Sequence, residues 1–395
     1  MAFFSSTLFF NLHLFLTIFL SFSGTDPVSG CYNSIFSFGD SLTDTGNWLY
    51  INSSSNIGNF PYGETFFHHP TGRSSDGRVV VDFIAQAFGL PFLPPYRACS
   101  DGRDLRHGAN FAVAGATAID AASYEEKKIG GVVANISLVD QIEWFKGLLP
   151  SLCLSSSGCR KFLRGSLFLV GEIGGNDYAQ LFSNGWSLEK IQTFVPQVVS
   201  TITSAVDTLI EHGAMTLVVP GGLPLGCFAS VLTFGASLNK EDYDNETGCL
   251  KRWNELLQYH NDRLQIELDR MRNLHPHVII IYADYYNSAM RIYRSPLQFG
   301  FSKGALSACC GSGGPYNYNS SVLCGTHEAR ICNDPSLYWN WDGSHPTEGG
   351  HRMIADDVIS GPYAFPPITC PCLQLASHVK YPHYHTKSQS FRASV

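Results

Sequence analysis

Four short apolar segments, separated by segments of helical periodicity, constrain the fold of this chain most strongly. Ser34–Phe38, Leu167–Val170, Met215–Val219 and Val278–Tyr282 each have the length of a buried strand. Apolar residues recur at helical spacing over Val79–Phe88, Leu138–Leu149, Leu188–His212, Cys249–Asn273 and Gly349–Ile359. Strands that alternate with helices predict an α/β fold with a parallel sheet and right-handed crossovers.

Two polar residues directly follow predicted strands. Ser41 lies in Phe-Gly-Asp-Ser-Leu at 38–42, and Asn176 lies in Gly-Glu-Ile-Gly-Gly-Asn-Asp at 171–177. Ligands of open parallel sheets bind beyond the carboxyl ends of the strands, so both side chains should meet at that edge. A serine in a glycine-containing turn is exposed to substrate there. The alternative is a serine that only caps a helix.

A base and a carboxylate for such a serine occur near the C-terminus, in Trp-Asp-Gly-Ser-His-Pro-Thr at 341–347. A serine hydroxyl is a weak nucleophile at neutral pH and needs a base that a carboxylate orients. Asp342 and His345 stand three residues apart and can supply both groups. The alternative is a surface Asp–His pair in a turn. His351 is a second histidine nearby, but it falls within the last predicted helix.

Donors for a developing oxyanion are the third requirement of acyl transfer. A backbone N–H at Gly115, in Asn-Phe-Ala-Val-Ala-Gly-Ala at 110–116, and the side-chain amide of Asn176 suit that task. Taken alone, each has an ordinary alternative: a small-residue packing turn at Gly115 and a strand-end turn at Asn176.

Together, in this order and spacing, the motifs resemble those of the GDSL esterase/lipase family, within the SGNH hydrolases, and specifically its large plant branch. The resemblance extends over roughly Ser34 to Pro366 and includes the stretches 219–227 and 308–319. The variants at 113–118 and 171–173 resemble the subgroup of acetylesterases and sinapine esterases. The resemblance implies a three-layer α/β/α sandwich with a mainly parallel, flavodoxin-like sheet.

The same resemblance implies a serine esterase that hydrolyses carboxylic esters through an acyl-enzyme, on a small-molecule substrate and with no cofactor or metal. Ser41 would be the nucleophile, His345 the base and Asp342 its orienting carboxylate. The Ser41 N–H, Gly115 and Asn176 would form the oxyanion hole. The alternatives are an acyltransferase that uses the same acyl-enzyme and a non-catalytic extracellular binding protein.

The ends of the chain differ from its middle. Residues 1–30 predict a secretory signal peptide, because the apolar run Leu8–Phe22 is shorter than the ~20 residues of a membrane helix and small residues allow cleavage near 24–30. The alternative is a buried N-terminal helix. Residues 31–368 would form the hydrolase domain and 369–395 a flexible tail, with a His-rich metal site as its alternative. We therefore expect a secreted, extracellular or vacuolar protein without stable membrane insertion after cleavage.

Twelve cysteines fit an oxidising compartment. Cys153 and Cys159 bracket a Ser-rich loop and could close a small ring, and Cys227 and Cys249 flank a polar segment. Four more crowd one loop, where a zinc site with His327 is the alternative to disulfides: Cys309, Cys310, Cys324 and Cys332. The sequence does not give the pairing, and four cysteines remain unassigned: Cys31, Cys99, Cys370 and Cys372.

Surface chemistry completes the prediction. Four acceptor sequons lie in predicted loops and predict glycosylation of a secreted chain: Asn52, Asn135, Asn245 and Asn319. The net charge of −7, without a dense basic cluster, argues against a nucleic-acid partner. His260 falls on the apolar stripe of its predicted helix and is interpreted as a core residue.

Overall fold

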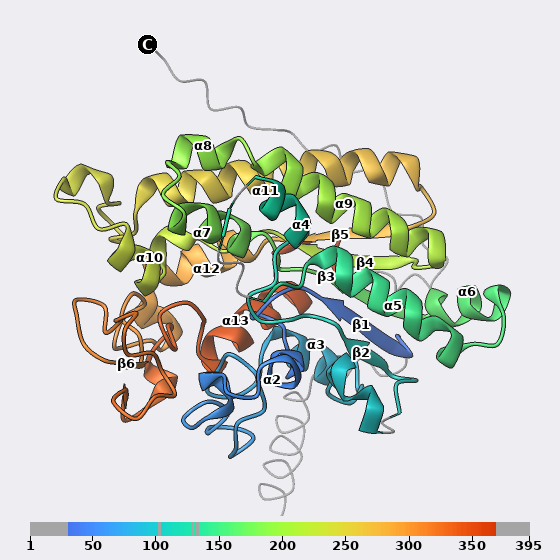
Figure 1. Cartoon of the computed structure of the whole chain (residues 1–395), viewed down its shortest axis with the longest axis horizontal. Coiled ribbons are helices and arrows are strands. Elements are labelled where there is room, and N and C mark those ends of the chain that lie inside the picture. The colour runs from blue at the N-terminus through green and yellow to red at the C-terminus, as the bar shows by residue number, and fades with distance from the viewer. Residues whose placement is uncertain (1–30, 102–103, 128, 131–133, 369–395) are drawn as a thin grey trace, which may run out of the picture.

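A six-stranded sheet forms the centre of the computed structural model, which describes residues 31–101, 104–127, 129–130 and 134–368 (Figure 1). The predicted signal peptide and C-terminal tail lie outside the described residues. The strand order is β2-β1-β3-β4-β5-β8. The strands are β1 Ser34–Phe38, β2 Gly108–Asn110, β3 Ser166–Val170, β4 Thr216–Pro220, β5 Ile279–Ala283 and β8 Ala364–Phe365.

The first five strands of the sheet run parallel, and β8 pairs antiparallel with β5. The four strands predicted from the sequence are confirmed to within one residue at each end. β2 and β8 were not predicted from the sequence, because strands of three and two residues are too short to show a recognisable apolar pattern. β2 also depends on Gly108, where a Cβ atom would lie 1.7 Å from the Ile35 carbonyl oxygen of β1.

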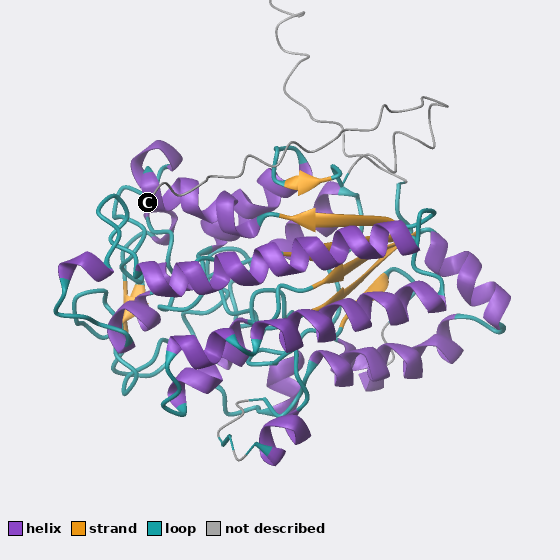
Figure 2. Ribbon diagram, turned by 90° about the horizontal axis from the view of Figure 1, so that it is seen from above, coloured by secondary structure: helices purple, strands orange, loops and turns teal. Residues whose placement is uncertain are grey.

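Helices cover both faces of the sheet, so the α/β/α sandwich is confirmed. α5 (Leu138–Leu152), α9 (Val195–His212) and α11 (Lys251–Leu274) lie on one face, and α3 (Val80–Ala87) and α13 (Glu348–Ile359) on the other (Figures 1 and 2). α12 (Tyr285–Arg294) packs against α13. Every residue of β1, β3 and β4 is buried, which explains why these strands are largely apolar and do not alternate between apolar and polar residues.

One predicted helix is divided. The segment expected as a single helix over Leu188–His212 forms α8 (Leu188–Gln192) and α9, with a break at residues 193–194. Pro196 stands in the first turn of α9. Proline has no N–H and clashes with the carbonyl four residues earlier inside a helix, so it favours a new helix start.

Short elements complete the chain and border the site described below. They are α2 (Asn47–Ile51), α4 (Ala121–Glu126), α6 (Ser156–Arg164), α7 (Gly175–Ser183), α10 (Ala229–Phe234), and a second two-stranded sheet of β6 (Cys310–Gly311) and β7 (Arg330–Ile331). None of the described helices has both the length and the apolar character needed to cross a membrane.

Disulfides form at the places where the sequence crowds its cysteines. The pairs are Cys153–Cys159, Cys227–Cys249, Cys309–Cys332 and Cys310–Cys324. The last two pairs contain the four cysteines that were also candidates for a zinc site. Their sulfur atoms are in disulfides, so these four cysteines offer no thiolate to a metal. Cys31 is also disulfide-bonded. The side chain of Cys99 and residues Cys370 and Cys372 lie outside the described part.

All four sequons lie outside helices and strands, as predicted. Asn135, Asn245 and Asn319 are exposed and Asn52 is partly exposed. The glycosylation itself stays a prediction.

Candidate active site

A tight turn at the end of β1 presents Ser41. Gly39 has a φ of 148°, and a Cβ atom there would lie 2.8 Å from the Glu172 carbonyl oxygen, so only glycine allows this approach of two backbones. Gln141 of α5 fixes the turn twice. Its Nε2 donates to the Gly39 carbonyl, and its Oε1 accepts from the Gly39 N–H, both at 2.8 Å.

Ser41, His345 and Asp342 form one hydrogen-bonded chain. The Ser41 Oγ lies 2.8 Å from Nε2 of His345, and Nδ1 of His345 lies 2.8 Å from Oδ2 of Asp342. Asp342 Oδ1 also accepts from the backbone N–H groups of Ser344 and His345, at 3.0 and 3.1 Å. Asp342 and His345 are already close in the sequence, and the fold brings His345 to Ser41 from 304 residues away.

Tyr62 is a fourth member of this chain. Its hydroxyl donates to Oδ2 of Asp342 at 2.8 Å, and its ring packs edge-on against Trp341. The sequence indicates only a long aromatic-rich loop at 52–78 and contains no pattern that links Tyr62 to Asp342.

The charges of the pair follow from these contacts. Burial opposes ionisation of Asp342, but His345 and the hydrogen bonds to the carboxylate hold the pKa of Asp342 below its ordinary value. Burial likewise opposes protonation of His345, but Asp342 and Asp40 together raise the pKa of His345 above its ordinary value. These contacts would therefore stabilise an imidazolium at His345.

His351 does not take part in this chain. It lies buried in α13, and neither ring nitrogen has a hydrogen-bond partner among the described residues. Glu348 precedes it by three residues, but that carboxylate accepts from Arg78 at 2.8 Å instead. Burial lowers the pKa of His351 to about 3, with His345 adding to the effect, so this histidine is neutral at physiological pH.

Two backbone donors in residues that line the cavity at the serine are unpaired among the described residues. The N–H groups of Ser41 and Gly115 have no acceptor among the described residues, and both residues line the same cavity. Gly115 adopts a φ of 82°, which few residues other than glycine adopt. Unpaired N–H groups beside a nucleophile can bind an oxyanion.

The amide of Asn176 is held from two sides. Its Nδ2 donates to Oδ2 of Asp40 at 3.0 Å and to the Ala116 carbonyl at 2.9 Å. Burial is the main cause that raises the pKa of Asp40 to about 7, although the Leu42 N–H opposes it. Asp40 thus orients the Asn176 amide beside the serine.

Two further carboxylates tie the loops of the site together. Asp44 accepts from the N–H of Ala114 at 2.9 Å and so joins the Gly115 loop to the serine loop. Asp177 of α7 accepts from the N–H groups of Ala118 and Ile119 at 2.8 and 3.1 Å. The three segments that carry Ser41, Gly115 and Asn176 are therefore fastened to one another by buried side chains.

Two cavities meet at Ser41 and His345. The smaller has a volume of about 110 Å³ and is lined largely by apolar residues: Leu42, Leu223, Leu225, Phe228, Val231 and Trp253. The larger, of about 360 Å³, is bordered by α2, by the 52–78 loop and by the disulfide-linked loop 309–332. Its lining includes Trp48, Ile57, Tyr62, Tyr318, Leu323 and Cys324. The serine thus stands between a small chamber and a larger one.

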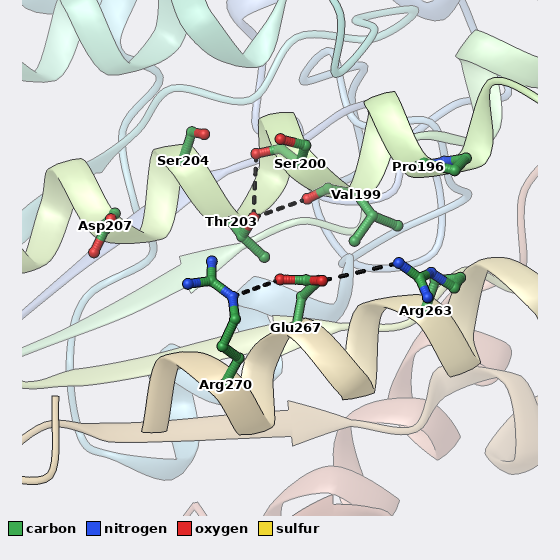
Figure 3. Close-up of a pocket in the computed structure, with 9 residues that line it drawn as sticks. All are labelled: Pro196, Val199, Ser200, Thr203, Ser204, Asp207, Arg263, Glu267 and Arg270. Carbon is green, nitrogen blue, oxygen red and sulfur yellow. Dashed lines mark hydrogen bonds and ion pairs between the residues drawn. The ribbon is translucent and has the colours of Figure 1, made fainter. Parts of the chain in front are cut away.

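A separate groove between α9 and α11 lacks this chemistry (Figure 3). Its volume is about 180 Å³, and Glu267 there binds Arg270 at 2.8 Å and lies 3.9 Å from Arg263. The Thr203 hydroxyl donates to the Val199 carbonyl, 3.2 Å away within its own helix. The groove therefore contains paired surface charges and no nucleophile with a base.

Known proteins resemble this chain over nearly its full length. The model of the GDSL-like lipase/acylhydrolase family matches residues 35–358. A GDSL esterase/lipase of Arabidopsis thaliana is 49% identical over 364 residues, which is 91% of this chain and 92% of the relative. A second from Arabidopsis thaliana is 45% identical and covers 97% of this chain and 98% of itself. A sinapine esterase of Brassica napus is 45% identical and covers 93% and 97%.

Proposed function

Because the chain belongs to the GDSL-like lipase/acylhydrolase family and is a carboxylic ester hydrolase, we propose that it cleaves esters through an acyl-enzyme on Ser41. The observation that carries the proposal is the 2.8 Å contact of Ser41 Oγ with His345 Nε2, beside two unpaired backbone N–H groups. The resemblance supports the same roles for Ser41, His345, Asp342, Gly115 and Asn176.

Acylation begins when His345 Nε2 accepts the Ser41 proton and Oγ attacks the ester carbonyl carbon. The carbonyl π electrons move onto the oxygen, which the N–H groups of Ser41 and Gly115 stabilise. The Asn176 amide joins them when it exchanges its hydrogen bond to Asp40 or to the Ala116 carbonyl for one to the oxyanion. Asp342 holds the imidazolium in place. The tetrahedral intermediate collapses, and the alcohol leaves with the proton from Nε2.

Deacylation repeats these steps with water. His345 Nε2 takes a proton from the water, whose oxygen attacks the acyl carbon, and Ser41 Oγ leaves with that proton. The carboxylic acid is then released. An acceptor alcohol in place of water would make the reaction an acyl transfer, and no feature of the described site favours that outcome.

We further propose that the protein is secreted and acts on small acylated natural products or acyl esters. The predicted signal peptide and the disulfides support secretion. Likeness to a protein named sinapine esterase supports a substrate among acylated natural products. The total volume near the serine, in two chambers of about 110 and 360 Å³, suits small molecules.

A fluorophosphonate probe tests the proposed nucleophile. We expect one covalent label on the wild-type chain and none on Ser41→Ala. Only wild-type protein that has not been labelled should hydrolyse p-nitrophenyl acetate, because the label blocks Ser41 Oγ. Ser344→Ala is the matched control, because Ser344 lines the same cavities but donates to Ser230 Oγ at 3.0 Å and contacts no base. It should keep the label. Labelling of Ser41→Ala at another serine would contradict the proposal.

Product analysis with added methanol separates the two reactions of an acyl-enzyme. We expect free acid as the main product of p-nitrophenyl acetate. A predominance of methyl acetate at low methanol concentration would assign the chain to acyl transfer.

A further inference from the structure

Glu172 is a buried carboxylic acid that the proposed mechanism does not use. It stands between β3 and α7, is only 5% exposed, and lines the smaller chamber together with Ser41 and His345. None of the described residues makes a hydrogen bond or ion pair with its carboxyl group. Neither carboxyl oxygen is fully enclosed by protein atoms, so the group is open to the chamber. Buried polar groups are nearly always hydrogen-bonded, so this one requires a partner inside the chamber.

The carboxyl group lies next to the turn that carries Asn176. A Cβ atom at Gly175, the residue directly before Asn176, would lie 3.8 Å from Glu172 Oε1 and 3.9 Å from Leu225 Cδ2. A Cβ atom at Gly222 would lie 3.4 Å from the same oxygen. The two glycines therefore leave space for the carboxyl group at the wall of the chamber, close to the groups that react.

The surroundings of Glu172 favour its neutral form. Burial, followed by the charges of Asp40 and Asp177, raises the pKa of Glu172 well above its ordinary value. No lysine or arginine is among the described residues that line the chamber. A neutral carboxylic acid donates one hydrogen bond and accepts others. Water has the same two abilities, so it can pair with Glu172 without any change of charge.

The volume of the chamber also favours water. About 110 Å³ is less than the ~150 Å³ cavity that holds a benzene ring, whereas a water molecule occupies only ~30 Å³ in the liquid. An ester with an aromatic part therefore requires the larger chamber of about 360 Å³, and the smaller one has room for several water molecules. Buried water in proteins binds mainly to polar groups that the protein itself leaves unpaired.

We propose that the smaller chamber supplies the water that hydrolyses the acyl-enzyme, and that Glu172 positions this water beside His345. The inference rests on the proposed acyl-enzyme at Ser41. Because Ser41 and His345 line both chambers, Nε2 can take a proton from water in the smaller one while the acyl group occupies the larger. The water oxygen bonds to the acyl carbon, the bond from that carbon to Ser41 Oγ breaks, and Oγ leaves with the proton from Nε2. Glu172 keeps its own proton and acts only through the water.

Competition between water and methanol for the acyl-enzyme tests the inference. p-Nitrophenyl acetate is converted at one fixed methanol concentration, and the ratio of methyl acetate to acetic acid is measured by gas chromatography. We expect Glu172→Met, whose side chain has a similar length but no strong donor or acceptor, to raise this ratio about fivefold or more, because water loses its partner. Glu172→Gln still donates and accepts and should stay within about twofold of the wild type. An unchanged ratio in Glu172→Met, or an equal rise in Glu172→Gln, would overturn the inference.

Leu225→Met is the matched control, because Leu225 lines the same chamber next to Glu172 Oε1 and has no polar group. It changes the packing of the chamber and should keep the wild-type ratio; a rise equal to that of Glu172→Met would also overturn the inference. Glu172→Leu is a second apolar variant and should behave as Glu172→Met does. The ratio counts only acyl-enzyme that has formed, so a low yield of folded protein does not alter it.

Stopped-flow kinetics separate the two half-reactions. In Glu172→Met the acylation rate should stay within about twofold of the wild type while deacylation slows, so a burst of p-nitrophenol should precede a slower steady rate. Equal slowing of both steps would indicate a structural effect and would refute the positioning role. If the wild-type chain forms no acyl-enzyme, the proposed function fails and the inference fails with it. Acyl-enzyme that forms in every variant with an unchanged product ratio refutes the inference alone.

Discussion

Tyr62 shows how one residue outside every recognised motif can adjust the proposed catalytic chain. Its hydroxyl donates to the Asp342 oxygen that also contacts His345. Tyr62→Phe should lower kcat by about tenfold, since a hydrogen bond to a charged group contributes about 1.5–3 kcal/mol. The more basic Asp342 carboxylate should also move the pH inflection of kcat/KM upward. Tyr318→Phe is the control, because Tyr318 lines the same cavity without a hydrogen bond to Asp342; an equal effect of both changes would contradict the role of Tyr62.

Asn176 should contribute mainly to the chemical step. Asn176→Ala removes the amide that Asp40 orients next to Ser41, so we expect kcat to fall about a hundredfold or more with a smaller change in KM. Steady-state kinetics on p-nitrophenyl acetate measure both constants. A normal kcat with a raised KM would instead assign Asn176 to substrate binding.

The pH dependence distinguishes the two neighbouring histidines. His345 must be neutral to accept the Ser41 proton, and the pKa of His345 is raised by Asp342 and Asp40 against the opposing effect of burial. The value of kcat/KM should therefore rise with pH through one ionisation above ~6.5 and then level. His345→Ala should lose activity and inflection together. His351→Gln should keep both, because His351 is already neutral in this range. If His351→Gln were inactive and His345→Ala active, the assignment of His345 as the base would be wrong.

At the scale of single residues, the sequence predicts those whose type and motif suit acyl transfer. It misses residues that reach the site only because the chain folds. A serine, an Asp–His pair and a glycine-rich loop are typical of acyl transfer and are visible in the chain. Tyr62 and Gln141 reach the site from a long loop and from the interior of α5, and their spacing to Ser41 follows no local pattern. Glu172 is visible within its motif, but its lack of a partner requires coordinates.

At the scale of elements, burial decides what the sequence can predict. β1, β3 and β4 are buried on both faces, so most of the five residues in each are apolar and the polar ones are small serines and a threonine. β2 is built from Gly-Ala-Asn and is defined by its pairing with β1 rather than by its composition. The short helices α2 and α10 have five and six residues, too few for a helical period to recur.

Loss of the Cys310–Cys324 disulfide should affect activity more than loss of a disulfide far from the site. Cys310 donates its N–H to the Trp341 carbonyl at 2.7 Å, next to Asp342, and forms a disulfide with Cys324. Replacing both cysteines by serine should lower stability by about 2–5 kcal/mol and reduce kcat/KM, because the Asp342 loop loses its support. Unfolding in urea and kinetics on the refolded protein measure both effects.

The distant disulfide provides the comparison. Cys153 and Cys159 join the end of α5 to α6, away from the residues that line the two chambers. The double serine variant there should lose stability and keep kcat/KM. If it lost as much activity as the Cys310–Cys324 variant at the same fraction folded, the support of Asp342 by its loop would be refuted.

At the scale of the whole molecule, the burial of acids and histidines links stability to pH in opposite directions. Burial is the leading cause that raises the pKa of Asp40 to about 7 and those of Asp44, Asp76 and Asp177 to about 6. Unfolded carboxyl groups titrate near ~3.9, so the folded chain binds more protons from about pH 4 to 7. This contribution to stability is complete below about pH 4 and is lost as the pH rises through 6–7.

Two buried histidines oppose this trend. Burial lowers the pKa of His260 to about 4 and, together with His345, that of His351 to about 3. Their contribution is present above ~6.5 and is lost as the pH falls toward the lowered values. The buried acids are more numerous, since the pKa of Glu172 is also raised by burial and its acidic neighbours. The free energy of unfolding should therefore be larger on the acid side of neutrality.

We accordingly expect the optimum of stability to lie at lower pH than the optimum of activity. The melting temperature should be higher at about pH 5.5 than at about pH 8. Hydrolysis should be faster at about pH 8, where a larger fraction of His345 is neutral than at about pH 5.5. Differential scanning calorimetry at constant ionic strength measures the first and initial rates the second. Asp76→Asn removes one buried acid and should reduce the gain in melting temperature on acidification. A melting temperature that falls steadily from about pH 8 to 5.5 would mean that the histidines outweigh the carboxylic acids.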